Sequence, residues 1–368
     1  MASTDWVKEA ERVMTICNAC RYCEGHCAVF PAMELRLSFP EPDLRYLANL
    51  CHGCGSCFHH CQYAPPHELN VNVPRVFDAL RRETYARHAW PRLLAPLFDR
   101  NALATGLATA LSCVVFVVAG TALAGPPALR AHLGPGAFYE VVPHGVMVVL
   151  FGLSFAYSIF ALAMACRAFW RESGEPGHRL SIEAHGRASS DSARLRYLDG
   201  GGDGCTYPDE RPSMSRRWYH HFTFYGFLLC FAATCVAALY DWFGRPAPYP
   251  LWSAPVVLGS AGGIGLLIGT IGLLALKAKS DAAPNPRSGM DVSFLLLLLL
   301  TSATGFLVLL FRATPAMGIL LLVHLGVVMG LFLTLPYGKF IHGLFRYAAL
   351  ARYAIERAKP PAAEPPEG

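Results

Sequence analysis

The sequence predicts a mainly α-helical membrane protein, with a polar, cysteine-rich head followed by a bundle of six transmembrane helices. Three observations predict this fold class. The first hundred residues hold eight of the thirteen cysteines. Six apolar stretches follow, each long enough to cross a hydrocarbon core of ~30 Å. Basic residues gather in alternate connections between these stretches, which is typical of a multi-pass protein with a fixed orientation.

The head, residues 1–100, is expected to be helical, with helical character at 5–16 and again at 74–85. No apolar segment precedes Cys17, so we expect no signal peptide and a cytoplasmic amino terminus. Eight cysteines in a reducing compartment favour metal ligation over disulfides.

The predicted bundle occupies residues 101–352. Its spans lie near 102–124, 143–166, 218–240, 254–276, 292–311 and 316–338. The loop 167–217 carries nine arginines, whereas three other loops carry one each, namely Arg130, Arg245 and Arg312. Basic loops mark the cytoplasmic side, which predicts a bacterial inner-membrane protein with both termini cytoplasmic. The net charge of +5 therefore reflects orientation in the lipid bilayer, not nucleic-acid binding. A tail at 353–368, rich in Pro, Ala and Glu at its end, is expected to be disordered.

Two cysteine runs share one spacing, with two, two and three residues between successive cysteines. Three thiolates spaced in this way bind one corner of a cubane, and in two-cluster ferredoxins the fourth cysteine ligates the other cluster. The spacing predicts two [4Fe-4S] clusters. The first set of ligands is Cys17, Cys20, Cys23 and Cys61, and the second set is Cys51, Cys54, Cys57 and Cys27.

Structural zinc is the alternative for these cysteines, but zinc sites use pairs of cysteines more than doubled runs of four. The residues between the runs form helices more readily than strands, which favours a helical ferredoxin-type head. Neighbouring histidines, among them His52, are expected to be solvated surface residues, with tuning of the clusters as the alternative. The head has no Gly-rich phosphate loop and no flavin fingerprint, so electrons must come from another protein.

Histidines within a membrane are costly and usually functional. A b-type haem that joins two helices needs two imidazoles at equal depth, and His221 and His342 both lie near the cytoplasmic ends of their spans. His220 is the alternative to His221, about 100° away around the helix. His324 lies 18 residues before His342, about five helical turns, so it shares a face with His342 but sits deeper. His144 begins the second span from its outer side.

The segment from His324 to His342 (HLGVVMGLFLTLPYGKFIH) resembles the last helix of the gamma subunit of respiratory nitrate reductase, a dihaem cytochrome b. The segment His221–Gly226 is similar to the partner helix of that family, where a second histidine follows ten positions later. Phe231 stands at that position here. The resemblance implies one haem b between His221 and His342. A second haem between His324 and His144 stays open, with hydrogen-bonded packing as the alternative.

The whole chain resembles the tricarballylate/citrate utilisation protein B family. The resemblance is most specific at CHGCGSCFHHCQYAPP (51–66), YLDGGGDGCTYP (197–208) and 217–231. It implies that the protein reoxidises a cytoplasmic FAD-dependent, tricarballylate dehydrogenase-like partner and reduces membrane quinone. A quinol-oxidising subunit that feeds a cytoplasmic reductase is one alternative, and a haem-free structural anchor is another. Cys205, within the glycine-rich loop, is expected to be a lone thiol. The loop itself would dock on the head, cover the haem or remain a solvated turn.

Overall fold

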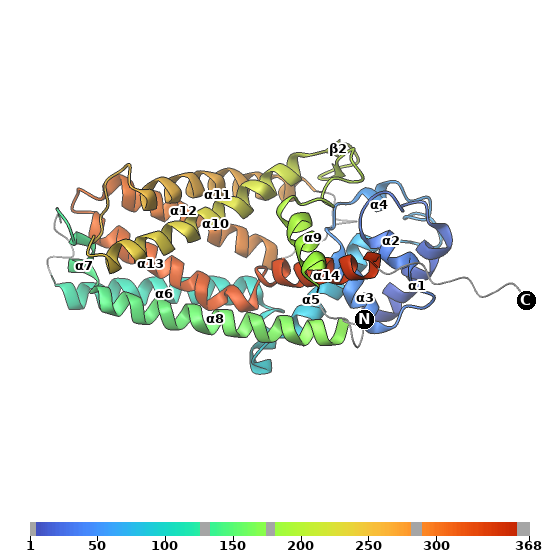
Figure 1. Ribbon diagram of the computed structural model, residues 1–368, viewed down its shortest axis with the longest axis horizontal. Helices are drawn as coiled ribbons and strands as arrows, with labels where there is room; N and C mark the ends of the chain where they lie inside the picture. Colours follow the sequence, from blue (N-terminus) through green and yellow to red (C-terminus); the bar gives the residue numbers. More distant parts are fainter. Residues whose placement is uncertain (1–4, 126–132, 174–180, 281–288, 359–368) are drawn as a thin grey trace, which may run out of the picture.

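The computed structural model describes residues 5–125, 133–173, 181–280 and 289–358. The molecule is elongated, with the head at one end and long helices running away from it (Figure 1). The head contains α1 (Trp6–Cys20), α2 (Val29–Glu34), α3 (Glu41–Leu50), α4 (Ser56–His59) and α5 (Val73–Arg87). The 3₁₀ turn η1 (Arg92–Leu97) leads into the bundle. The predicted mainly α-helical architecture is confirmed.

Six helical segments are long and apolar enough to cross a membrane, as the sequence predicts for a multi-pass protein. They contain α6 (Asn101–Ala124), α8 (His144–Ser173), α10 (Ser215–Trp242), α11 (Ala254–Lys279) and α12 (Gly289–Phe311). The last comprises α13 (Met317–Thr334), η3 (Leu335–Tyr337) and α14 (Ile341–Ala358). A short helix, α7 (Ala137–Val141), lies at the end of the bundle far from the head (Figure 1). Arg130, one of the predicted outer-loop arginines, is outside the described residues.

Glycines bring the helices of the bundle close together, which matters because lipid provides no hydrophobic drive for helix association. A Cβ atom at Gly226 of α10 would lie 2.8 Å from the carbonyl oxygen of Gly262 in α11. A Cβ atom at Gly269 would lie 2.5 Å from the backbone nitrogen of Thr223. In α13, a Cβ atom at Gly330 would lie 2.7 Å from Cα of Thr109 in α6. The α10–α11 and α6–α13 pairs therefore depend on backbone contact.

The last helix, α14, extends from the bundle into the head. There it lies beside α3 and α9 (Ile182–Ala193; Figure 1). Leu350 and Tyr353 belong to the same buried core as Phe30 and Leu47 of the head. The expectation that disorder begins at 353 is therefore wrong, because α14 continues to Ala358 and buries apolar side chains there. The remainder of the predicted tail, 359–368, lies outside the described residues.

The loop predicted at 167–217 contains more structure than a membrane connector needs. Its beginning extends α8 to Ser173, and its middle forms α9. A two-stranded antiparallel ribbon follows, with β1 (Cys205–Thr206) paired to β2 (Pro212–Ser213). Gly201 approaches the head closely, since a Cβ atom there would lie 2.8 Å from the carbonyl oxygen of Gly25. Of the three alternatives considered for the glycine-rich loop, the structure agrees with the first, because the loop packs against the head.

Candidate functional site

The eight cysteines of the two runs line two adjacent cavities in the head. One cavity, with about 360 Å³ of atom-free space, is lined by Cys27, Cys51, Cys54 and Cys57. The other, with about 430 Å³, is lined by Cys17, Cys20, Cys23 and Cys61, and Cys57 also reaches its wall. The grouping matches the two sets expected from the spacing. Among the described residues, no three His, Cys, Asp or Glu side chains are placed to hold a single metal ion.

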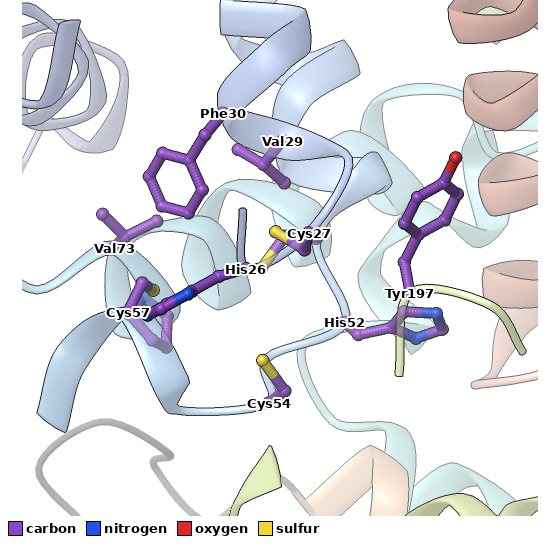
Figure 2. Close-up of a pocket in the computed structure, with 11 residues that line it drawn as sticks. His26, Cys27, Val29, Phe30, His52, Cys54, Cys57, Val73 and Tyr197 are labelled. Atoms are coloured by element: carbon purple, nitrogen blue, oxygen red, sulfur yellow. The ribbon is translucent and has the colours of Figure 1, made fainter. Parts of the chain in front are cut away.

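Shared side chains separate the two cavities. Phe30, Cys57 and Val73 line both of them, so the two cavities are direct neighbours. In Figure 2, Phe30 and Val73 lie on one side of the cavity of the second set, and His52 and Tyr197 lie on another. Four thiols around atom-free space fit a [4Fe-4S] cubane, because such clusters are held by four cysteine thiolates.

The backbone of the second cysteine run turns sharply at two glycines, which places its cysteines around the cavity. The helix α3 ends at Leu50, and Cys51 follows in an extended conformation. Gly53 and Gly55 then adopt positive φ angles of 61° and 84°, which glycine tolerates far better than other residues. A Cβ atom at Gly55 would lie 2.5 Å from the carbonyl oxygen of Thr206 in β1. The glycine therefore allows both the turn and the contact with the ribbon.

The thiols of the two sets differ in their electrostatic surroundings. Burial raises the pKa values of Cys17 and Cys23 to about 12, and neighbouring thiols add to the effect. A hydrogen bond from the Cys205 thiol lowers the pKa of Cys54 to about 6, and the backbone and side chain of Ser56 contribute further. Cys205 is buried, and it packs in one cluster with Cys54. The expectation that Cys205 is a lone thiol is therefore wrong, because β1 places it against a cysteine of the second set.

Three arginines from three different helices hold the backbone of the second run. Arg81 of α5, Arg216 of α10 and Arg346 of α14 donate to the four successive carbonyl groups of residues 50–53. Arg346 Nη1 donates to Leu50 O (2.5 Å), Arg81 Nη1 to Cys51 O (2.6 Å), and Arg216 to His52 O (3.1 Å) and Gly53 O (2.5 Å). Because Arg216 and Arg346 belong to the bundle, these bonds also attach the head to the membrane-spanning part.

His52 connects the second cavity to the histidines of the bundle. It lines the cavity, and its side chain interacts electrostatically with His220 and His342. Burial lowers the pKa of His52 well below its usual range, and the charges of Arg346, His342, His220 and Arg216 lower it further. The expectation that His52 is a solvated surface residue is therefore wrong.

Of the two adjacent histidines in α10, the structure places His220 near His342. The Nδ1 atom of His220 is buried, and it has no hydrogen-bond partner within the described residues. The hydroxyl of Tyr85 lies 3.3 Å from Nδ1 of His342. His221 instead stacks on the half-exposed ring of Tyr225 with 5.8 Å between ring centroids.

The other two histidines of the bundle have partners of their own. His324 Nδ1 lies 2.9 Å from the hydroxyl of Thr304 in α12. His144 Nε2 lies 2.8 Å from a carboxylate oxygen of Asp241 at the end of α10. The structure does not bring His144 and His324 together. Their hydrogen bonds agree with the packing alternative considered for both residues.

Comparisons with known proteins agree with this organisation. Residues 10–87 match the model of the "Citrate utilization protein B Fer4-like domain", and residues 96–363 match the model "Citrate utilization protein B". A protein from Escherichia coli named "Citrate utilization protein B" is 49% identical over 358 residues, which are 95% of this chain and 93% of that protein. No solved structure matches the chain. The chain thus belongs to the citrate utilization protein B family, with a Fer4-like head and a multi-pass bundle suited to electron transport.

Proposed function

We propose that the protein transfers electrons from a cytoplasmic FAD-dependent dehydrogenase, of the tricarballylate dehydrogenase type, to the membrane quinone pool. Two [4Fe-4S] clusters and a haem b would supply the one-electron chemistry when bound. The first set of cysteines, Cys17, Cys20, Cys23 and Cys61, would hold one cluster, and the second set, Cys27, Cys51, Cys54 and Cys57, the other. The membrane side that carries the head, here taken as cytoplasmic, is part of this proposal.

The observation that carries the proposal is the continuity of the candidate sites. The two cavities share the walls formed by Phe30 and Val73. His52 lies at the second cavity and interacts with His220 and His342 of the bundle. Redox-active groups held at these places would lie in sequence from the head towards the membrane.

The haem site that we propose uses His342 together with His220. Both imidazoles come from helices of the bundle, and the buried Nδ1 of His220 has no hydrogen-bond partner among the described residues. The Tyr85 hydroxyl would orient the His342 ring by accepting a hydrogen bond from its Nδ1, as outer partners of ligating histidines do. His221 stays the alternative expected from the family resemblance.

The proposal is tested on the full chain purified anaerobically in detergent. We expect about eight iron and eight sulfide ions per chain in non-haem clusters, and a reducible b-type Soret band. Mixing with a reduced tricarballylate dehydrogenase-type flavoprotein should reduce both kinds of centre, and added quinone should reoxidise them. Reduction by quinol, without reduction by the flavoprotein, would favour the opposite direction of flow. A protein without a Soret band would support the haem-free anchor instead.

A further inference from the structure

The charges around the two sets of cysteines are unequal. Near the second set, Arg81 and Arg346 are buried, each with only 6% of its surface exposed. The charge neighbours of Arg346 include Cys27, Cys51 and Cys54, and its Nη2 atom is buried without a hydrogen-bond partner in the described part of the chain. A buried guanidinium without a full set of partners is costly, so an anion beside it is strongly favoured.

Donors also approach the sulfur atoms of the second set directly. The backbone N–H of Gly53 donates to Cys51 Sγ at 3.2 Å, and the buried thiol of Cys205 packs with Cys54 and lowers its pKa. The glycine-rich loop fixes Cys205 in place, because β1 pairs with β2 at Cys205 and Ser213. A Cβ atom at Gly204 would lie 2.7 Å from the backbone nitrogen of Ser213, so the loop fits closely there.

In the first set, backbone N–H groups of Tyr63 and Ala64 approach Cys61, but no arginine is among the charge neighbours of Cys17, Cys23 or Cys61. The charge neighbours that raise the pKa values of Cys17 and Cys23, after burial, are other cysteines. The side-chain amide of Gln62 is 4.0 Å from Cys20 Sγ, at the outer limit for a bond to sulfur. All four cysteines of this set are partly exposed, whereas Cys51 and Cys54 are buried.

We propose that Arg81, Arg216, Arg346 and Cys205 raise the reduction potential of the cluster at the second set above that of the cluster at the first set. Positive charge and hydrogen bonds to the cysteine sulfurs stabilise the reduced cluster, because it is more negative than the oxidised one. These four residues would therefore act on the cluster without binding it. One electron that enters at the first set then moves to the second set, beside His52 and the bundle histidines. The inference rests on the proposed function, because it requires both clusters.

The test is a redox titration of the full-length holoprotein in detergent, followed by the electron paramagnetic resonance signals of the two reduced clusters. Arg216→Met removes a charge and two hydrogen bonds to the loop, and Cys205→Ala removes the thiol donor. Each variant should lower only the higher of the two midpoint potentials. The expected size is about a tenfold fall in the ratio of electron occupancy between the clusters, or ~59 mV for one electron.

Conservative variants separate tuning from folding. Arg216→Lys keeps the charge and Cys205→Ser keeps a donor, so both should retain most of the wild-type potential. Arg187→Met, on the exposed face of α9, is the matched control and should change neither potential. A shift in the lower potential, equal shifts in both, or no shift in either would overturn the inference. Absence of two clusters from the wild-type protein, seen in its iron and sulfide content, would instead overturn the proposed function itself.

Discussion

The carboxylate of Glu356 forms an ion pair of 2.5 Å with the guanidinium of Arg36, and so joins the end of α14 to the head. Both side chains are less than a tenth exposed. Glu356 also pairs with Arg352 at 2.8 Å and accepts a hydrogen bond of 2.9 Å from the Tyr46 hydroxyl. Asp43 of α3 also pairs with both arginines, so two carboxylates neutralise two buried cations at the junction between the last helix and the head.

Replacing the carboxylate of Glu356 should loosen the head. Glu356→Gln leaves Arg36 and Arg352 to share the carboxylate of Asp43, which pairs with both of them, so we expect a cost below the ~3–5 kcal/mol of a fully unpaired buried charge. We expect earlier thermal unfolding and faster limited proteolysis of the head in detergent. Glu183→Gln is the control, because Glu183 forms an exposed pair with Arg187, and such pairs contribute about 1 kcal/mol or less. Equal stability of the two variants would show that α14 is not held by this carboxylate.

The two adjacent histidines of α10 should differ in their effect on haem. His220→Ala should abolish the reducible Soret band and leave the cluster signals intact, because His220 is the histidine of this pair that interacts electrostatically with His342. His221→Ala should retain the band, because His221 stacks on Tyr225. The measurement is the dithionite-reduced minus oxidised spectrum, normalised to protein. Loss of the band in His221→Ala, but not in His220→Ala, would show that His221 is the ligand paired with His342, as the family resemblance implies.

The hydroxyl of Tyr85 should influence the haem potential. An acceptor at Nδ1 makes a ligating histidine more basic and stabilises the oxidised metal. Tyr85→Phe removes the group that lies 3.3 Å from His342 Nδ1, so the midpoint potential should rise while haem content stays the same. Optical redox titration measures this. Tyr240→Phe, near the end of α10 far from the head, serves as the control and should have no effect.

The remaining histidines should not be haem ligands. The Nε2 atom of His144 is paired with Asp241, so it does not offer His324, whose Nδ1 is bonded to Thr304, a second imidazole for a haem. His324→Gln and His144→Gln should therefore keep the wild-type ratio of haem to protein, measured by the pyridine haemochrome method. Loss of half of the haem in either variant would demonstrate a second haem at that residue.

The close contact of α10 and α11 should tolerate no side chain at its glycines. Gly269→Val places atoms where the Thr223 nitrogen lies, 2.5 Å from an ideal Cβ, and should reduce the yield of folded protein severely. Gly152→Val in α8 adds the same atoms where nothing lies within 4 Å, and should behave as wild type. Fluorescence-detected size-exclusion chromatography compares the two. A monodisperse Gly269→Val protein would contradict the packing of these helices.

The sequence predicts the helical class, the six apolar spans and the grouping of cysteines, because these depend on local hydropathy and on spacing alone. Which of His220 and His221 interacts with His342 could not be predicted from the sequence, since the rotation of α10 about its axis depends on the contacts of Gly226 and Gly269 with α11. The spacing of cysteines says nothing of Cys205, which reaches Cys54 through the pairing of β1 and β2. The arginine contacts to residues 50–53 join positions up to 296 apart, and no local pattern marks them.

The position of α14 has a consequence for biosynthesis. The head is the first part of the chain to leave the ribosome, but its core includes Leu350 and Tyr353, near the opposite terminus. The head cannot close until the last membrane-spanning segment has been inserted and α14 has been released. Until then the loop at Leu50 lacks the hydrogen bond from Arg346 that holds it in the finished fold. A chain that stalls before α14 therefore lacks part of the core of the head and one of the three arginines that hold residues 50–53.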